Sequence, residues 1–290
     1  MKNISFEKKP LAIEIQTVSF CNSGCIICPY RSVAGKLPHG RMSMDLFMRI
    51  LDQVEDNKAI RIIPYFNNEP FLDPLIFKRL RYICTTHPSV EIELSTNVSR
   101  LNEKYQNELA AYHIHDLRLS VFGFTDETHK KVMPGLNWKE VQNNLSLLIK
   151  NKALRSNVDN ISIVMIDFPG LTKKDIFLAE KFCKESSLNF EFWGFMDRSG
   201  NVENFSNQIN KKEVFGCEQN RPLERLHINF QGDVVLCCMD WKWKHKLGNL
   251  KRNSIDEIWN SSKYKEYRNA IYNNGSDKYT DLCKKCKLAL

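Results

Sequence analysis

Three cysteines near the start of the chain have the spacing of a metal-binding loop. Cys21, Cys25 and Cys28 form the pattern C-x3-C-x2-C in the run SFCNSGCIICPY. Three thiolates within eight residues can bind one iron–sulfur cluster and leave one of its irons without a protein ligand. A structural zinc site would need a fourth cysteine or histidine close by, and the nearest histidine, His39, lies eleven residues beyond Cys28. The spacing therefore favours an iron–sulfur cluster with an open position.

Four further cysteines form a second set in the last part of the chain. They are Cys217, Cys237, Cys283 and Cys286. Their full pattern is C-x14-G-x4-C, a gap of 45 residues, and then C-x2-C. Four thiolates with one C-x2-C pair suit either a closed zinc site or a 4Fe-4S cluster, and the spacing alone does not choose between them.

Three cysteines belong to neither set. Cys84 and Cys183 lie on the apolar faces of expected helices, so we expect them in the core. Cys238 directly follows Cys237 and is open to three interpretations. It would be an additional metal ligand, a hydrogen-atom donor to a substrate radical, or a small buried apolar residue.

The composition indicates a cytoplasmic protein whose thiols bind metal or take part in redox chemistry. The 290 residues include ten cysteines, which are too few for a disulfide-dense secreted scaffold. The N-terminal run MKNISFEKKPLAIEIQ has lysines and a proline where a secretory signal needs an apolar core. No stretch approaches the roughly 20 apolar residues of a membrane-spanning helix. In the cytoplasm, structural disulfides are not expected.

Positive charge is concentrated in the C-terminal segment. The chain has 42 basic and 34 acidic residues, a formal charge of +8. Residues 242–290 hold twelve of the basic and five of the acidic residues, which gives this segment a charge of +7. Such a segment suits a solvated surface, a nucleic acid, an anionic ligand or an acidic redox partner.

From Leu11 to Trp193 the sequence alternates between strand-like and helix-like patterns. Runs rich in β-formers predict strands over 11–17, 60–66, 90–96, 116–122, 160–166 and 188–193. Apolar residues at every third or fourth position predict helices over 44–56, 73–87, 102–113, 138–151 and 172–187. This alternation predicts a parallel α/β sheet, either open or curved into a partial barrel. Functional residues of such folds gather at the carboxyl ends of the strands, and the cysteine triplet follows the first strand.

A polar segment without periodicity, 197–216, predicts a linker to a second unit. Beyond it, the runs 225–230 and 234–239 with Gly232 between them predict a β-hairpin. Two short helical patterns follow, over 255–259 and 263–272.

The cysteine triplet directly after a strand resembles the motif of the radical S-adenosylmethionine (SAM) enzymes. This resemblance implies a partial (β/α)6 TIM barrel in which Cys21, Cys25 and Cys28 hold a 4Fe-4S cluster. In the family, SAM binds the open iron, and its reductive cleavage releases a 5′-deoxyadenosyl radical that abstracts hydrogen from the substrate. The residue before the third cysteine packs on the adenine in the family, and here it is Ile27.

The resemblance extends to polar residues at the ends of later strands. The segment Asn67-Asn68-Glu69-Pro70 stands where the family has a Gly-Gly-Glu-Pro-like segment, and Glu69 is implied to bind the methionine ammonium. The ends of the third and fourth strands are implied to offer polar groups to the ribose and the carboxylate, although such residues are also common in turns. The implied SAM-binding positions are Ile27, Asn68, Glu69, Ser95, Asn97 and Ser120.

The second cysteine set resembles the twitch domain, a shortened SPASM domain that binds an auxiliary iron–sulfur cluster. The runs GDVVLCCMDW, LGNL and SIDEIWNS agree with it. The resemblance implies that the four cysteines of this set bind a 4Fe-4S cluster. Because the chain ends four residues after Cys286, we expect a single auxiliary cluster. We therefore expect a radical SAM barrel over 1–205 and a twitch unit, a β-hairpin with helices, over 206–290.

Two enzymatic functions remain open at this stage. The first is oxidation of a small polar molecule, such as a sugar or cyclitol, with the auxiliary cluster as electron acceptor. The second is modification of a peptide by epimerisation, cross-linking or side-chain oxidation. A distant third, a zinc-stabilised protein that binds nucleic acid, explains the lysines but not the cysteine triplet.

The radical SAM function also implies a redox partner and a base. A flavodoxin- or ferredoxin-like reductant would supply electrons, and the basic C-terminal segment suits either this acidic partner or the negative charge of the auxiliary cluster. Oxidation releases a proton, for which Tyr30, Arg31, Asp167 and Arg198 lie at suitable strand ends. The sequence does not choose among them.

Overall fold

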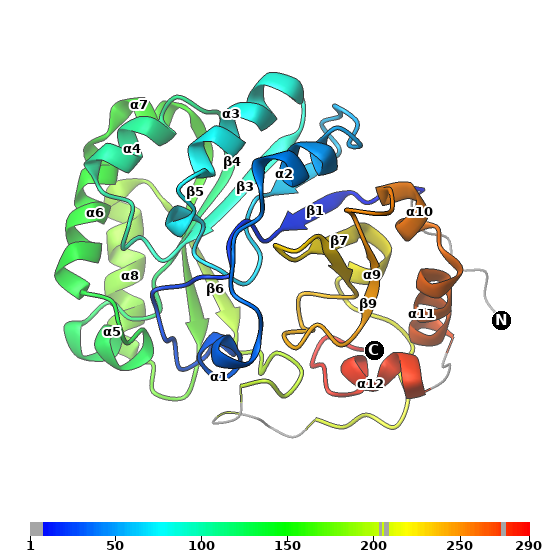
Figure 1. The fold of residues 1–290 in the computed structure, drawn as a ribbon. Helices are drawn as coiled ribbons and strands as arrows, with labels where there is room; N and C mark the ends of the chain where they lie inside the picture. Colours follow the sequence, from blue (N-terminus) through cyan, green and yellow to red (C-terminus); the bar gives the residue numbers. More distant parts are fainter. Residues whose placement is uncertain (1–7, 203–204, 206–208, 274–276) are drawn as a thin grey trace.

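The computed structural model describes residues 8–202, 205, 209–273 and 277–290. Its centre is a nine-stranded sheet with the order β6-β5-β4-β3-β2-β1-β7-β8-β9 (Figure 1). Strands β1 to β6 are parallel neighbours, each followed along the chain by at least one helix until β6. Helices α3 to α8 lie along the outer side of these strands (Figure 1). This is the parallel α/β fold that the alternating sequence patterns predict.

All six predicted strands and all five predicted helices of this region are present. The strands are β1 Ala12–Ile15, β2 Arg61–Ile63, β3 Glu91–Thr96, β4 Ile114–Ser120, β5 Val158–Asp167 and β6 Asn189–Gly194. The predicted helices are α2 Met44–Leu51, α3 Ile76–Thr86, α4 Glu103–Leu109, α6 Trp138–Lys150 and α8 Lys173–Ser186. Short helices that the sequence patterns did not indicate are α1 Tyr30–Val33, η1 Ala34–Lys36, η2 Pro70–Leu72, α5 Asp126–Val132 and α7 Lys152–Ser156. These have too few turns to show a helical period.

The parallel strands have one apolar and one polar face. In β3, Ile92 and Leu94 belong to the hydrophobic core, whereas Glu93 and Ser95 line a cavity on the opposite side of the sheet. Strand β4 shows the same alternation of core and cavity residues. Successive side chains of a strand point to opposite faces, so this pattern separates the core beneath the helices from the inner side of the barrel.

The C-terminal hairpin continues the sheet. Strand β7 (Arg225–Ile228) pairs in parallel with β1, and β8 (Asp233–Val235) and β9 (Lys246–Asn249) follow it in antiparallel order. The predicted turn is confirmed, with Gly232 at a φ of 86°, a left-handed conformation that glycine adopts without strain. The hairpin therefore lies directly beside the strand that carries the cysteine triplet.

The remaining helices gather beside this hairpin (Figure 1). They are α9 Arg221–Glu224, α10 Ile255–Trp259, α11 Ser262–Tyr272 and α12 Asp277–Lys284. The two predicted helices, α10 and α11, bury Trp259 and Tyr264 completely. None of the helices in the described ranges is long and apolar enough to cross a membrane. The domain boundary after residue 205 stays a prediction.

Candidate active site: two cysteine-lined cavities

The first cysteine set lies on one wall of a cavity at the carboxyl ends of the parallel strands. Cys21, Cys25 and Cys28 all line this cavity, which has a volume of about 290 Å³. The backbone of their loop is held by α5 and the turn after it, because Gly24 N donates to Pro134 O at 2.8 Å and Ile26 N to Val132 O at 3.0 Å. We call this cavity the main cavity.

The three cysteine side chains lie in an environment that raises the pKa of each thiol. Burial, together with the negative charge of neighbouring Glu69, raises the pKa of Cys21 to about 12. Burial also raises the pKa of Cys25 and Cys28. A cationic iron centre would favour the thiolate form that burial alone disfavours.

The spacing of the thiols does not suit a single zinc ion. Within the described residues, two groups bring three possible ligand atoms within 4.8 Å of one another, and neither cysteine set is among them. Sulfurs bound to one zinc at about 2.3 Å lie only about 3.8 Å apart. A larger iron–sulfur cluster fits the wider arrangement.

All six residues predicted to bind SAM lie around the main cavity. They are Ile27, Asn68, Glu69, Ser95, Asn97 and Ser120. Ile27 belongs to the cysteine loop itself, and the structure brings the other five residues to this loop from the ends of β2, β3 and β4. Whether each of them contacts SAM stays a prediction.

Glu69 is the most constrained of these residues. Its carboxylate is 2% exposed and accepts hydrogen bonds from Asn97 N at 2.8 Å and Thr96 Oγ1 at 2.7 Å. Burial raises its pKa to about 7, although these hydrogen bonds oppose the rise in part. A buried carboxylate with a raised pKa gains from a cationic partner, and the ammonium of a bound amino acid would be one.

The other predicted residues form two small hydrogen-bonded groups. Ser95 Oγ and Ser120 Oγ lie 3.2 Å apart at the ends of adjacent strands. Asn97 Nδ2 donates to Asn22 Oδ1 at 2.9 Å, which ties the end of β3 to the cysteine loop. The buried Nδ2 atom of Asn68 has no hydrogen-bond partner in the described structure and is available to a ligand.

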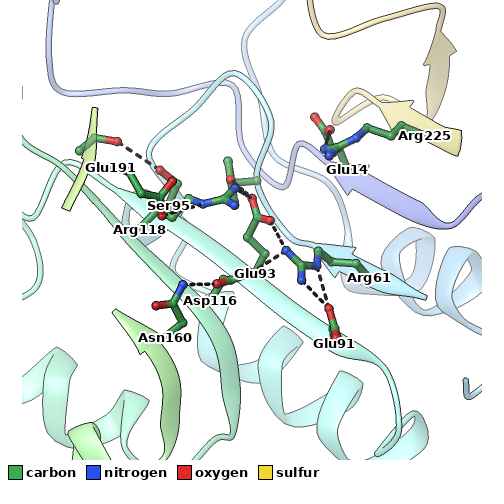
Figure 2. A network of polar contacts seen from close by, with 12 residues as sticks. Glu14, Arg61, Glu91, Glu93, Ser95, Asp116, Arg118, Asn160, Glu191 and Arg225 are labelled. Atoms are coloured by element: carbon green, nitrogen blue, oxygen red, sulfur yellow. Dashed lines mark hydrogen bonds and ion pairs between the residues drawn. The ribbon is translucent and has the colours of Figure 1, made fainter. Parts of the chain in front are cut away.

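A charged network that sequence reasoning missed forms another wall of the main cavity (Figure 2). Glu93 accepts hydrogen bonds from Arg118 Nη1 at 2.5 Å, Tyr65 Oη at 2.6 Å and Arg61 Nη1 at 3.0 Å. Glu93, Arg118 and Tyr65 line the cavity. Alternation of polar residues along the third and fourth strands was the signal that could have identified these groups.

A second charged group comes from β1 and β7. Glu14 Oε1 lies 3.0 Å from Arg225 Nη1 and 3.5 Å from Nε2 of the fully buried His227. Burial raises the pKa of Glu14, but His227 and Arg225 outweigh it and lower the pKa to about 2. Burial lowers the pKa of His227, but Glu14 outweighs it and raises the pKa to about 9. Glu14 and Arg225 line this side of the cavity, and buried His227 supports Glu14 from behind it.

Two of the four candidates for the base lie at the main cavity. Tyr30 and Arg198 line it. Arg31 is exposed and lies outside it, and Asp167 lines a different, more open hollow beside Phe168. The cavity position favours Tyr30 and Arg198 over the other two.

The second cysteine set surrounds a separate, much smaller cavity. Cys217, Cys237, Cys283 and Cys286 all line a space of about 20 Å³. They come from three segments far apart in sequence, which meet because Cys217 forms a β-bridge with Ala289 and Cys286 N donates to Cys283 O at 2.8 Å. Apolar side chains complete the lining, among them Pro222, Leu236, Leu282 and Leu288. This enclosed set of four thiols fits a fully ligated cluster.

Cys238 belongs to the main cavity, although its neighbour Cys237 belongs to the smaller one. Its Sγ accepts a hydrogen bond from Arg221 Nη1. With Glu14 and His227 it forms a group of three possible ligand atoms within 4.8 Å of one another. The structure therefore does not place Cys238 among the cysteines of the second cavity.

The fold and the cysteine loop are those of a radical SAM protein, and comparison with known proteins agrees. Residues 15–183 match the family model of the Radical SAM superfamily, and residues 217–287 match SPASM, an iron–sulfur cluster-binding domain. The first match covers more than half of the chain. The chain belongs to the Radical SAM superfamily and is an enzyme with SAM and two iron–sulfur clusters as its cofactors.

The chain is similar to enzymes with different kinds of substrate. It is 24% identical over 279 residues to the S-adenosyl-L-methionine-dependent 2-deoxy-scyllo-inosamine dehydrogenase of Niallia circulans, which covers 94% of this chain and 91% of the relative. The crystal structure of BtrN with AdoMet and 2-DOIA has a TM-score of 0.65 at 20% identity, over 99% of this chain and 94% of BtrN. Streptococcus suis SuiB bound to its precursor peptide SuiA has a TM-score of 0.69 at 14% identity, over 98% of this chain and 71% of SuiB. The structural matches show the fold alone.

Proposed function

We propose that this enzyme oxidises a hydroxyl group of a small polar molecule, a sugar or cyclitol, to a carbonyl group. The observation that carries the proposal is the lining of the main cavity. One wall holds the cysteine triplet and the positions predicted to bind SAM, and the others hold the charged networks of Glu14 and Glu93. The similarity to a cyclitol dehydrogenase over 94% of the chain supports it.

The polar and charged lining of the main cavity suits a small substrate rich in hydroxyl groups. Glu14 is charged at neutral pH because its pKa is about 2, so it can accept a hydrogen bond from a hydroxyl or an ammonium. Arg118 and Arg225 can donate to hydroxyl oxygens on the same substrate. Fixed groups of both signs would orient one C–H bond of the substrate.

The SAM side of the cavity would hold the cofactor through the residues that the sequence predicts. Glu69 would bind the methionine ammonium, Ile27 would pack on the adenine, and the Ser95–Ser120 pair would bind hydroxyl groups. Bound to its cluster, SAM supplies a 5′-deoxyadenosyl radical that takes one hydrogen atom from the substrate. Phe122, Met133 and Ile166 form an apolar part of the wall that excludes water from this region.

The second cysteine set would receive the electron that the oxidation releases. Conversion of an alcohol to a ketone removes two hydrogens: one leaves as a hydrogen atom, the other as a proton and an electron. Cys237 at the second cavity is bonded in sequence to Cys238 at the main cavity, so an auxiliary cluster would lie close to the substrate. Of the two candidates at the cavity, Tyr30 could relay the proton through its hydroxyl group, whereas Arg198 stays protonated and cannot accept it.

The cysteines and the charge of the chain support a cell compartment and a redox partner for this enzyme. None of the ten cysteines forms a disulfide, which suits a cytoplasmic enzyme. A flavodoxin- or ferredoxin-like reductant would deliver the electron for SAM cleavage, and the basic segment 242–290 suits an acidic partner.

The proposal is tested by anaerobic turnover with SAM, dithionite and a panel of cyclitols, aminocyclitols and sugars that includes 2-deoxy-scyllo-inosamine. We expect one ketone product, with 5′-deoxyadenosine formed in equal amount. With substrate deuterated at the oxidised carbon, deuterium should appear in the 5′-deoxyadenosine. Release of 5′-deoxyadenosine without ketone or deuterium transfer for every compound would reject this substrate class.

A peptide is the second candidate substrate, and one observation favours it. Strand β6 is the edge of the sheet, with Phe192 44% exposed and Trp193 37% exposed. Trp193 also lines the main cavity, so an extended peptide paired with β6 would reach it. Deuterium transfer from a peptide encoded near this gene, and not from the cyclitol panel, would establish this alternative.

A further inference from the structure

Arg221 stands in the wall between the two cavities. It is the first residue of α9, four residues after Cys217. Of the described residues that line these cavities, Arg221 is the one that lines both. Its charge therefore faces the proposed substrate position on one side and the second cysteine set on the other.

Hydrogen bonds fix the orientation of the Arg221 guanidinium. Gln219 Oε1 accepts from its Nε at 2.8 Å and from its Nη2 at 2.5 Å. Nη1 donates to Sγ of Cys238, the residue next to Cys237. An arginine held by three such bonds keeps its full charge and has little freedom to turn away.

Arg221 shares the nearby carboxylate of Glu14 with two other cations, Arg225 and His227. The second cavity is lined by apolar groups and cysteines, and Arg221 is the charged side chain in that lining. Inside such a low-dielectric wall, a fixed cation interacts strongly with a cluster that gains negative charge.

We propose that Arg221 raises the reduction potential of the auxiliary cluster and so makes this cluster the acceptor for electrons from the main cavity. The physical basis is that reduction adds one negative charge to the cluster, which a fixed cation stabilises. This inference rests on the proposed role of the second cysteine set in substrate oxidation. It assigns Arg221 an electrostatic positioning role and no bond-making step.

The test measures the midpoint potential of the auxiliary cluster in the full-length chain. Cys21, Cys25 and Cys28 are replaced by alanine so that the EPR signal comes from the auxiliary cluster alone. The protein is then reconstituted anaerobically and titrated potentiometrically with EPR detection. Arg221→Gln should shift the potential to a more negative value, and Arg221→Lys should shift it less than half as far. Lys285→Gln is the matched control: Lys285 lies between Cys283 and Cys286 but is exposed, so solvent screens its charge and the potential should not change.

A second variant keeps the inference testable if replacing Arg221 causes loss of the cluster. Gln219 is exposed, and Gln219→Glu places a negative charge on the same guanidinium, so it should also make the potential more negative. An unchanged potential in both Arg221→Gln and Gln219→Glu would overturn the inference, as would a shift in Lys285→Gln of equal size. A shifted potential in an enzyme that oxidises none of the proposed substrates would instead reject the proposed function alone.

Discussion

The two cysteine sets differ in how the chain builds them. The first set comes from one loop of eight residues and lines a cavity of about 290 Å³ with charged walls. The second set comes from three separated segments and lines a space of about 20 Å³ with apolar walls. Three thiols beside a large polar cavity leave room for ligands, whereas four thiols around a small apolar space do not.

The open and the closed site are therefore held in place by different kinds of contact. The first loop is local in sequence and takes its shape from α5 and the turn after it, as the bonds from Gly24 and Ile26 show. The second site holds distant parts of the chain together, including Cys217 and the segment around Ala289. We therefore expect substitutions in the first site to lower enzymatic activity, and substitutions in the second site to lower both enzymatic activity and the stability of the fold.

The largest effect is expected from removing the first set. Replacing Cys21, Cys25 and Cys28 together by alanine should abolish SAM cleavage, because no open iron remains to bind the cofactor. The fold should persist, since the loop adds few contacts to the main core. The measurement is 5′-deoxyadenosine release with dithionite; Cys84→Ala, a substitution outside both sets, should leave it unchanged. Release by the triple variant at the wild-type rate would remove the distinction between the sites.

Loss of the second site should separate SAM cleavage from substrate oxidation. Cys283→Ala should eliminate the auxiliary cluster and ketone formation, while 5′-deoxyadenosine release without substrate stays within about threefold of the wild type. The melting temperature should fall by about 5 °C or more, because bound clusters stabilise the folded state. If Cys283→Ala still formed ketone, the auxiliary cluster would not be the electron acceptor.

A moderate effect is expected for cofactor binding at the open site. Glu69→Gln should weaken SAM binding about 10- to 100-fold, since the hydrogen bond to a charged group contributes about 1.5–3 kcal/mol. The cluster itself should form normally. The affinity for SAM is measured by titration, from the change that SAM causes in the EPR signal of the cluster. Glu103→Gln, at an exposed position of α4, is the control. Equal SAM affinity in the two variants would remove Glu69 from the binding site.

The smallest effect is a pH dependence confined to the first site. His129 on α5 is fully buried, and burial lowers its pKa to about 4, with the nearby Asp126 opposing this in part. Because the unfolded value is about 6.5, its contribution to stability is complete above pH 6.5 and is lost as the pH falls toward 4. Hydrogen-exchange protection of Gly24 and Ile26 should fall over this range, while that of Cys286 should not.

A variant provides the control for this pH dependence. His129→Leu removes the titrating group and should make the protection of Gly24 and Ile26 independent of pH between 6.5 and 4. Equal losses of hydrogen-exchange protection at Gly24 and Cys286 in the wild type would contradict this prediction, because they would show that acid destabilises both sites together.

The sequence predicted the parts of the site that depend on spacing along the chain. The cysteine loop and Glu69 follow directly after strands, and parallel strands bring their carboxyl ends to one edge. The alternation that places Glu93 and Arg118 in the cavity was also present in the sequence. That alternation identifies cavity residues only when it is known that the inner side of the barrel is polar.

Other features could not be predicted because they depend on which distant segments meet. A hairpin pattern does not specify that β7 pairs with β1, and this pairing brings Glu14 to Arg225. The division of Cys237 and Cys238 between two cavities likewise depends on how the hairpin packs. The position of Arg221 between the cavities follows from the same packing and had no signal in the spacing of residues.

The most direct test of the two-site account is the iron content and Mössbauer spectrum of anaerobically reconstituted protein. The account predicts about eight irons per chain in the wild type and about four after removal of either cysteine set, since each set holds one 4Fe-4S cluster. The four irons that remain without the first set should not respond to SAM, whereas those that remain without the second set should. About four irons in the wild type, or a SAM response from the second set, would contradict the account.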